Sequence, residues 1–170
     1  MSSIVINLND LPKIRAHFLK HDTKSRNDPV RCRVLAQLID IEDLDPRHEI
    51  ENKFYLCNIR LQNLSAFESL SPSSSACCDI KVRMDERVYT SVFLDQAMSV
   101  QTGAACDVNL VAWHNIGQKE IDTDIWEVVD ISVLFPSEIT EFHDFFITDE
   151  GKHFLSLSNP CMPLESSTEE

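Results

Sequence analysis

Glycine is scarce in this sequence, with three residues in 170, namely Gly103, Gly117 and Gly151. Loops that hold phosphate groups in P-loop and dinucleotide-binding proteins need several closely spaced glycines, so the sequence excludes both kinds of site. Long apolar runs are missing too, and no stretch approaches the roughly 20 apolar residues of a membrane-spanning helix. Residues 1–4 contain no basic segment followed by an apolar one, so we expect neither a secretory signal nor a membrane partner.

Positive charge is also in short supply. The chain has 15 Lys and Arg residues against 28 Asp and Glu residues, which gives a formal net charge of −13 at pH 7. A protein that binds nucleic acid alone usually presents a basic surface, so the charge favours a protein that works mainly through a protein partner. Seven of the basic residues, but only three acidic ones, lie within residues 1–33. This asymmetry predicts either a face that attracts polyanions or a solvated helix and loop.

The cysteines and histidines lack the spacing of a metal site. No Cys-x-x-Cys pair occurs, although structural zinc sites usually use such pairs. His17 and His21 share a helix face without a third ligand, and no nucleophile, base and orienting group come together. We therefore expect no metal, no cofactor and no catalytic residue, and reduced cysteines that mostly serve as small core residues. The cysteines are Cys32, Cys57, Cys77, Cys78, Cys106 and Cys161.

Helices are predicted near both ends of the chain. Asp10 can cap a helix over residues 11–21, whose first turn tolerates Pro12 because the N–H that proline lacks has no helical partner there. A second amphipathic helix is expected at residues 137–146. The following residues, 148–170, are polar and acidic and predict a disordered tail.

Alternating apolar residues predict five β-strands between these helices, at residues 30–42, 54–64, 80–94, 106–114 and 125–135. We expect loops at residues 42–51 and 65–75, and a short helix at 95–101 that Gly103 ends in a left-handed conformation. The inward residues should be Cys32, Val34, Ala36 and Leu38 in the first strand, Tyr55, Cys57, Ile59 and Leu61 in the second, and Ile125, Val129, Ile131, Val133 and Phe135 in the last.

Five strands with one short helix before the fourth have the element order of the OB-fold, a barrel that binds oligonucleotides or oligosaccharides in many proteins. We therefore expect an all-β chain, a five-stranded OB-fold barrel with flanking N-terminal and C-terminal helices. Its parts would be an N-terminal helix and linker at residues 1–29, the OB-fold with its C-terminal helix at 30–147, and the acidic tail at 148–170.

Parts of this pattern resemble OB-fold subunits of telomere-capping and replication-protein-A-like complexes. The segments that are similar to the opening strands of that family are residues 30–42, residues 54–64 (Phe-Tyr-Leu-Cys-Asn-Ile-Arg-Leu-Gln-Asn-Leu) and residues 89–95 (Tyr-Thr-Ser-Val-Phe-Leu-Asp). Cys106-Asp107-Val108 resembles the family's Gly-Asp-Val-Val-like entry to strand four, with Gly103 displaced. The resemblance spans residues 30–146. It implies a nuclear protein at chromosome ends, paired with another OB-fold subunit and a larger scaffold, in a complex that engages single-stranded DNA.

The helix after the last strand is the expected partner-binding surface. A closed barrel does not need another helix over its side, so an apolar stripe on this helix would be exposed unless something covers it. The resemblance implies that paired OB-fold subunits join through this helix. The alternative is that the helix folds back on its own barrel. The partner-binding residues expected are Ile139, Phe142, Phe145 and Phe146.

Direct binding of single-stranded nucleic acid needs aromatic side chains for base stacking and cations for the phosphates. Outward positions of the second and third strands, together with the first, offer a modest groove of this kind. The alternative is that Tyr89, Phe93 and Trp113 plug the barrel or cover its ends. The nucleic-acid-binding residues expected are Arg31, Arg33, Phe54, Arg60, Lys81, Arg83 and Tyr89.

Together these observations predict a non-catalytic OB-fold subunit of a chromosome-end (telomere) capping or single-stranded-DNA-binding complex. It would act in the nucleus, mainly by heterodimerisation through its C-terminal helix, and would add limited surface to a shared DNA site. The competing interpretation is a protein-interaction adaptor with no role in nucleic-acid binding.

Overall fold

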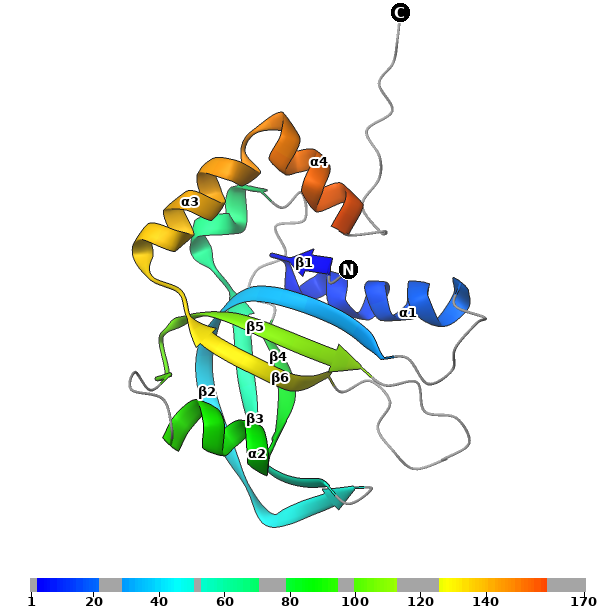
Figure 1. The fold of residues 1–170 in the computed structure, drawn as a ribbon, viewed down its shortest axis with the longest axis vertical. Helices are drawn as coiled ribbons and strands as arrows, with labels where there is room; N and C mark the ends of the chain where they lie inside the picture. Colours follow the sequence, from blue (N-terminus) through cyan, green and yellow to red (C-terminus); the bar gives the residue numbers. More distant parts are fainter. Residues whose placement is uncertain are drawn as a thin grey trace, which may run out of the picture.

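A computed structural model describes residues 3–21, 29–50, 53–70, 79–94, 100–112 and 126–158 of the chain (Figure 1). The strands are β1 (Ser3–Val5), β2 (Val30–Ile50), β3 (Lys53–Asn63), β4 (Asp79–Asp85), β5 (Ala105–Ala112) and β6 (Trp126–Val133). The helices are α1 (Leu11–His21), α2 (Glu86–Tyr89), α3 (Pro136–Phe146) and α4 (Asp149–Ser158). Two 3-10 helices, η1 (Leu8–Asp10) and η2 (Ser65–Leu70), and a π-helical turn, η3 (Thr90–Leu94), complete the described elements.

Strands β2 to β6 form a closed barrel. Their order is β2–β3–β4–β6–β5, and β5 pairs back with β2. Strand β2 reaches both neighbours because residues 30–37 pair antiparallel with β5 and residues 36–50 pair with β3. The ring closes through a short parallel pairing of β4 with β6, in which Val82 lies beside Trp126. The all-β OB-fold barrel with flanking helices is confirmed.

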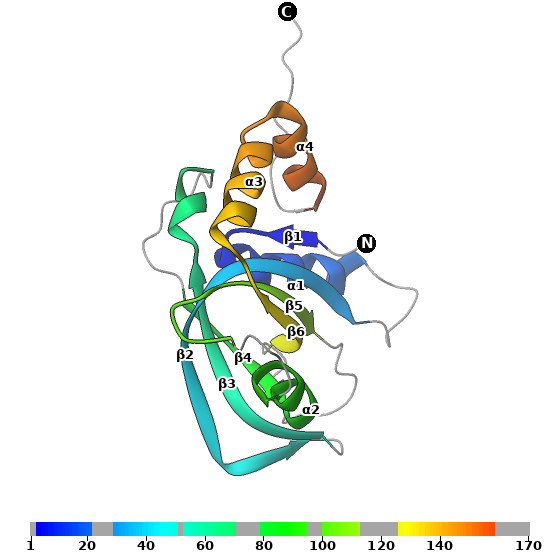
Figure 2. The ribbon, with the colours of Figure 1, turned by 60° about the vertical axis from the view of Figure 1, so that its left-hand side comes forward.

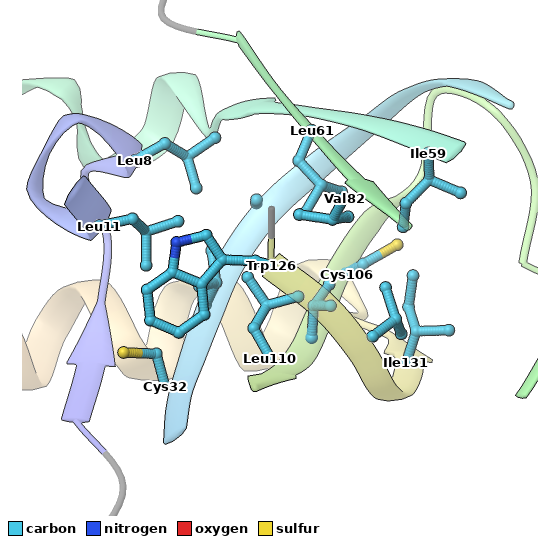
Figure 3. Close-up of a cluster of buried hydrophobic side chains, with 14 of the residues drawn as sticks. Leu8, Leu11, Cys32, Ile59, Leu61, Val82, Cys106, Leu110, Trp126 and Ile131 are labelled. Carbon is cyan, nitrogen blue, oxygen red and sulfur yellow. The ribbon is translucent and has the colours of Figure 1, made fainter. Parts of the chain in front are cut away.

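The barrel core contains the inward residues that alternation predicts for the first two barrel strands, except Tyr55, which is buried beside Arg83. Trp126, at the start of β6, fills much of this core, and Figure 3 shows its indole beside Leu11 and Cys32. Burying an aliphatic or aromatic side chain of this size contributes about 1.5–3 kcal/mol. The predicted inward residues are each at most 3% exposed: Cys32, Val34, Ala36 and Leu38 in β2, and Tyr55, Cys57, Ile59 and Leu61 in β3.

The N-terminal segment packs into the same core. The side chain of Asn7 accepts hydrogen bonds from the backbone N–H of Asn9 (3.1 Å) and from Asn63 Nδ2 (3.2 Å), and Asn63 Oδ1 accepts one from the backbone N–H of Leu8 (2.8 Å). These bonds hold η1 against the end of β3. The helix expected at 11–21 is present as α1, and its inner side reaches the barrel core. The core residues from this segment, each at most 1% exposed, are Leu8, Leu11 and Ile14.

A second apolar core lies outside the barrel, on the outer side of β2, where α3 and α4 lie together at one end of the molecule (Figures 1 and 2). Leu35 points into it from β2 and is 0% exposed. Strand β1 runs parallel to β2, with Ile4 opposite Arg33, and forms one edge of this core. The helix expected at 137–146 is confirmed as α3. The buried residues of the second core are Ile4, Ile6, Leu35, Leu64, Phe67, Leu134, Phe146 and Leu155.

Three segments predicted as irregular contain regular structure. The prediction of a loop at 42–51 is wrong, because β2 continues to Ile50 and pairs there with β3. The two strands form a ribbon that projects beyond the barrel near α2 (Figures 1 and 2). Residues 65–70 of the expected connector form η2, since Phe67 anchors them in the second core. Residues 149–158 of the expected tail form α4, which Leu155 anchors in the second core. The rest of the expected connector and tail, residues 71–78 and 159–170, lies outside the described part.

The segment at 88–94 is helical, so the strand predicted there is wrong. Asp85 Oδ1 accepts a hydrogen bond from the backbone N–H of Val88 (2.9 Å) and caps α2. Val88 and Val92, spaced i and i+4, then face the barrel core. This is the helix that the OB-fold places before its fourth strand, and it precedes the predicted position at 95–101; residues 95–99 lie outside the described part. Gly103 has a φ of 92°, which confirms its predicted left-handed conformation.

The inward side of β6 is partly mispredicted. Val129 is 45% and Phe135 46% exposed, whereas Val128 and Ile131 are at most 1% exposed. A register shift in the pairing with β5, between Asn109 and Leu110, changes the side on which the residues of β6 point. A β-bulge of this kind interrupts the two-residue period on which the prediction rests. Residues 113–125, including Trp113 and Ile125, lie outside the described part.

Replacing Ile14 should show that α1 stabilises the barrel. Ile14→Ala removes a side chain that is 0% exposed, so we expect the free energy of unfolding in urea to fall by about 2–5 kcal/mol. The neighbouring exposed change Lys13→Ala should alter it by less than about 0.5 kcal/mol. Equal effects of the two changes would contradict the packing of α1 into the core.

Candidate partner and nucleic-acid surfaces

The predicted partner stripe on α3 packs mostly against its own chain. Phe146 is 1% exposed, and its ring lies 5.6 Å from that of Phe67 and 5.8 Å from that of Phe142, measured between centroids. Ile139 and Phe142 are partly buried against the second core. α3 therefore packs on its own chain, and the partner assignment of its other residues stays a prediction. Phe146 is not available to a partner in this conformation, because the second core encloses it.

An exposed apolar flank remains on α3 and its two ends. Phe145 is 42% exposed, and its ring packs edge-on against Phe154 of α4 with 5.8 Å between centroids. Phe135, just before α3, is 46% exposed and Ile147, just after it, is 48% exposed. We call these three residues, Phe135, Phe145 and Ile147, the α3 flank. Phe145 and Ile147 lie at the end of α3, and Phe135 lies at its start. Apolar side chains exposed on a protein surface are a common feature of protein-binding sites.

The junction between α3 and α4 is close-packed. A Cβ atom on Gly151 would lie 1.8 Å from the backbone oxygen of Phe145. Any side chain at residue 151 would therefore push the two helices apart. Glycine at this position lets α4 fold back on α3 and fixes where Phe145 and Phe154 meet.

Arg33 joins the predicted nucleic-acid surface to the predicted partner helix. Its Nε donates to both carboxylate oxygens of Asp107 at 2.9 and 3.0 Å, and its Nη2 lies 2.5 Å from Asp107 Oδ2. Its guanidinium carbon lies 5.6 Å from the ring centroid of Phe142. The hydrogen bond to Asp107 raises the pKa of the Arg33 guanidinium. Arg33 therefore positions α3 on the barrel and is committed to an intramolecular pair.

The outer side of β2, β3 and β4 carries the main group of predicted nucleic-acid residues. Strand pairing arranges its side chains in three rows across the sheet. This is the face that OB-folds commonly use for oligonucleotides. It holds three cations and three carboxylates, so its formal charge is zero. We call it the β2–β3–β4 face; its rows are Gln37, Gln62 and Asp79, then Asp40, Arg60 and Lys81, then Glu42, Asn58 and Arg83.

The exposed cations of this face have carboxylate partners. Arg60 forms an ion pair with Asp79, with side chains 37% and 38% exposed. Lys81 Nζ lies 3.1 Å from Glu42 Oε2, a contact that crosses β3. A phosphate approaching either cation would meet a carboxylate at short range. The face therefore lacks the surplus of positive charge that holds a polyanion.

Arg83, the third cation of the face, lies at its edge in a buried group where the barrel closes. Its guanidinium carbon lies 4.4 Å from the ring centroid of Tyr55. In the backbone pairing of β4 with β6, Arg83 lies opposite Glu127, which is 3% exposed. Burial, and next the charge of Glu127, raise the pKa of Tyr55 to about 12. Arg83 Nε is buried there without a hydrogen-bond partner, and the guanidinium is held over the Tyr55 ring.

The structure separates the remaining predicted residues. Arg31 is exposed on β2 but pairs with Val111 of β5, away from the β2–β3–β4 face. Tyr89 packs beside Phe93, 5.1 Å between ring centroids, and both lie partly buried against the barrel core. They cover one end of the barrel, as the alternative interpretation predicts. The side chain of Phe54 lies outside the described part.

The described cysteines behave as core residues. Burial raises the pKa of Cys32 and Cys106 from 9.0 to about 12 and that of Cys57 to about 11, which keeps all three thiols protonated and unreactive at neutral pH. Among the residues that the structure describes, no three His, Cys, Asp or Glu side chains gather to hold a metal ion. No helix in the described ranges is both long and apolar enough to cross a membrane.

The geometry defines an OB-fold protein with a β2–β3–β4 face of zero formal charge and exposed apolar side chains on α3 and at its ends. No family model matches the sequence. The chain is 24% identical over 129 residues to telomere length regulation protein TEN1 of Saccharomyces cerevisiae, covering 76% of this chain and 74% of that protein. The fold matches a chain in the crystal structure of yeast Stn1 and Ten1 with a TM-score of 0.58 and 15% identity, covering 90% of this chain and 95% of that one. A resemblance to the fly telomere-capping protein Modigliani, which the sequence pattern also suggests, is not confirmed.

Replacing Arg33 should loosen α3 on the barrel. Arg33→Lys keeps the charge but loses the forked hydrogen bonds to Asp107 and the flat contact with Phe142. Because the Arg33 side chain is 37% exposed, we expect a loss of about 1 kcal/mol in the free energy of unfolding. The matched change Arg31→Lys on the same strand should cost less than about 0.5 kcal/mol. A smaller effect at residue 33 than at residue 31 would refute the positioning role.

Alkaline pH should destabilise the protein through its buried thiols. In the unfolded chain a cysteine ionises near pH 9.0, whereas burial raises the folded pKa to about 11 for Cys57 and about 12 for Cys32 and Cys106. The stability they contribute is therefore complete below about pH 9 and is lost as the pH rises toward the folded values. Urea unfolding from about pH 8 to 11 should show this fall, and Cys106→Ala should make it shallower. A free energy of unfolding that stays constant over this range would contradict the burial of the thiols.

Proposed function

We propose that this chain is a non-catalytic OB-fold subunit of a telomere-capping complex, and that it works in the nucleus at chromosome ends as one half of a heterodimer. The observation that carries this proposal is the sequence similarity to telomere length regulation protein TEN1, which extends over about three quarters of both proteins. The structural likeness to a chain from the crystal structure of yeast Stn1 and Ten1 covers nearly the whole fold and supports the same conclusion.

The partner in this proposal is a second OB-fold subunit, with a larger scaffold beyond it. The α3 flank is the contact surface, since it joins exposed apolar side chains to a helix that the barrel and Arg33 hold in a fixed position. A rigid apolar anchor loses little conformational freedom on binding, so it contributes most of its burial energy to the complex. Of the predicted partner residues, Phe145 has the most exposed ring, and Ile139 and Phe142 border it from the second core.

Single-stranded DNA is a ligand of the whole complex in this proposal, and this chain adds only limited surface to the shared site. Its net charge of −13 and its neutral β2–β3–β4 face oppose tight binding by the chain alone. The same neutrality favours a second candidate, a protein-interaction adaptor with no role in nucleic-acid binding. Fluorescence anisotropy with a single-stranded oligonucleotide separates the two: a subunit strengthens DNA binding by its co-purified partner, and an adaptor leaves it unchanged.

The variant Phe145→Asp tests the interface. We expect the tagged chain, purified from nuclei, to recover an OB-fold partner by mass spectrometry, and the variant to lose it. Burying a phenylalanine contributes roughly 1.5–3 kcal/mol, and an unpaired carboxylate in the same interface costs more. Phe142→Asp is a poorer probe, because Phe142 also packs against the second core and would destabilise the isolated chain.

Thr140→Asp is the matched control, since it places a carboxylate on an exposed position of α3 away from the flank. It should retain the partner, and circular dichroism should show both variants folded. Recovery of the same OB-fold partner with Phe145→Asp would overturn the interface, and the absence of any OB-fold partner with the unmodified chain would overturn the proposed function.

A further inference from the structure

The β2–β3–β4 face has the geometry of a ligand surface but not its charge. Arg60 and Lys81 lie directly opposite each other on β3 and β4, which places their Cβ atoms about 5 Å apart. Both side chains leave the same side of the sheet, so they could contact neighbouring phosphates of one strand. The carboxylates of Asp79 and Glu42 lie beside Arg60 and Lys81, where these phosphates would bind.

We propose that the β2–β3–β4 face is a latent binding surface for the backbone of single-stranded DNA, which Asp79 and Glu42 keep closed. The choice of DNA as the ligand rests on the proposed function. The closure itself rests on the two ion pairs and on the charge balance of the face. The proposed closure makes direct DNA binding dependent on two carboxylates, each on a different strand from the cation that it neutralises. Asp79, at the start of β4, pairs with Arg60 of β3, and Glu42 of β2 pairs with Lys81 of β4.

Exposed ion pairs of this kind stabilise a fold very little. The pairs are about as exposed as surface pairs usually are, with side chains from 37% to 59% exposed. Their loss should therefore not unfold the barrel, whose inner side beneath them, Ile59, Leu61 and Val82, is 0% exposed. What the carboxylates do is repel a phosphate within a few ångströms of each cation, where screening by salt is least effective.

The other predicted cations do not offer an equivalent surface. Arg33 is paired with Asp107 and covered in part by Phe142. Arg83 is held over Tyr55 at the barrel closure. Arg60 and Lys81 are therefore the two cations of the face that neutralising Asp79 and Glu42 would release from their ion pairs, and Asp40, opposite Arg60, is the carboxylate of the face that remains.

The double variant Asp79→Asn with Glu42→Gln tests the closure in the full-length isolated chain. The probe is a thymidine oligonucleotide of about 12 nucleotides, within the site size of one OB-fold, followed by fluorescence anisotropy. We expect affinity at low salt to rise roughly tenfold over the unmodified chain, because two repulsive charges become neutral amides. The slope of log affinity against log salt should steepen by about 1.4, the value for two further phosphate contacts on a single strand.

Two matched variants separate a local effect from a change in net charge. Glu141→Gln with Asp144→Asn removes the same charge from exposed positions on α3, so it should give less than a twofold gain. Adding Arg60→Gln and Lys81→Gln to the first variant should return affinity to that of the unmodified chain. Equal gains from the two double variants, or no gain from the first, would overturn the closed face.

These outcomes are independent of the heterodimer. Failure of the double variant to bind DNA would leave partner recovery from nuclei unaffected, and loss of the partner in nuclei would leave binding by the isolated chain unaffected. Circular dichroism of each variant verifies that the barrel is intact, since all substituted side chains are on the surface.

Discussion

Burial of β2 on both of its sides is the constraint on which the rest of the structure depends. Val34 and Ala36 point into the barrel and Leu35, between them, points out, yet all three are 0% exposed. The outer side of a barrel strand normally faces water, so Leu35 requires a second layer. β1, η2, α3 and α4 supply that layer. Because α3 is used in this way, its apolar stripe packs on its own chain, and the exposed apolar side chains of α3 and its ends are those of the α3 flank.

Alternation predicted the fold where a strand has one solvent-facing side and one buried side, as in β3, where Cys57, Ile59 and Leu61 all face the core. It failed where another interaction determined the backbone. Asp85 caps α2 and turns a segment rich in β-branched and aromatic residues into a helix, because a satisfied helix start and core contacts at i and i+4 outweigh intrinsic strand preference. The Asp-Glu pair at 85–86 was the signal in the sequence. The residues around the bulge in β6 carry no comparable signal in the sequence that would predict the bulge.

The surfaces were less predictable than the fold. The sequence indicated Arg60, Lys81, Arg83 and Phe145 as candidate site residues, but not the side chains that contact them. Glu42 and Lys81 are far apart along the chain and meet only because the register of two strand pairings brings them together. Arg33 and Phe142 were assigned to different surfaces, although the fold makes them one contact. Charge pairing across a sheet depends on register, and a single sequence does not reveal register.

The second core has a consequence for how the protein is made. It joins Ile4 and Ile6 to Phe146 and Leu155, and β1 contacts α4 directly. A ribosome releases residues in order, at about 5–20 residues per second, so the barrel strands emerge well before α4 can cover β1. During that interval Leu35 lacks the part of its cover that Phe146 and Leu155 supply. The last part of the second core to be synthesised is therefore α4, so the cover that Leu155 gives to β1 and β2 is the last to be added.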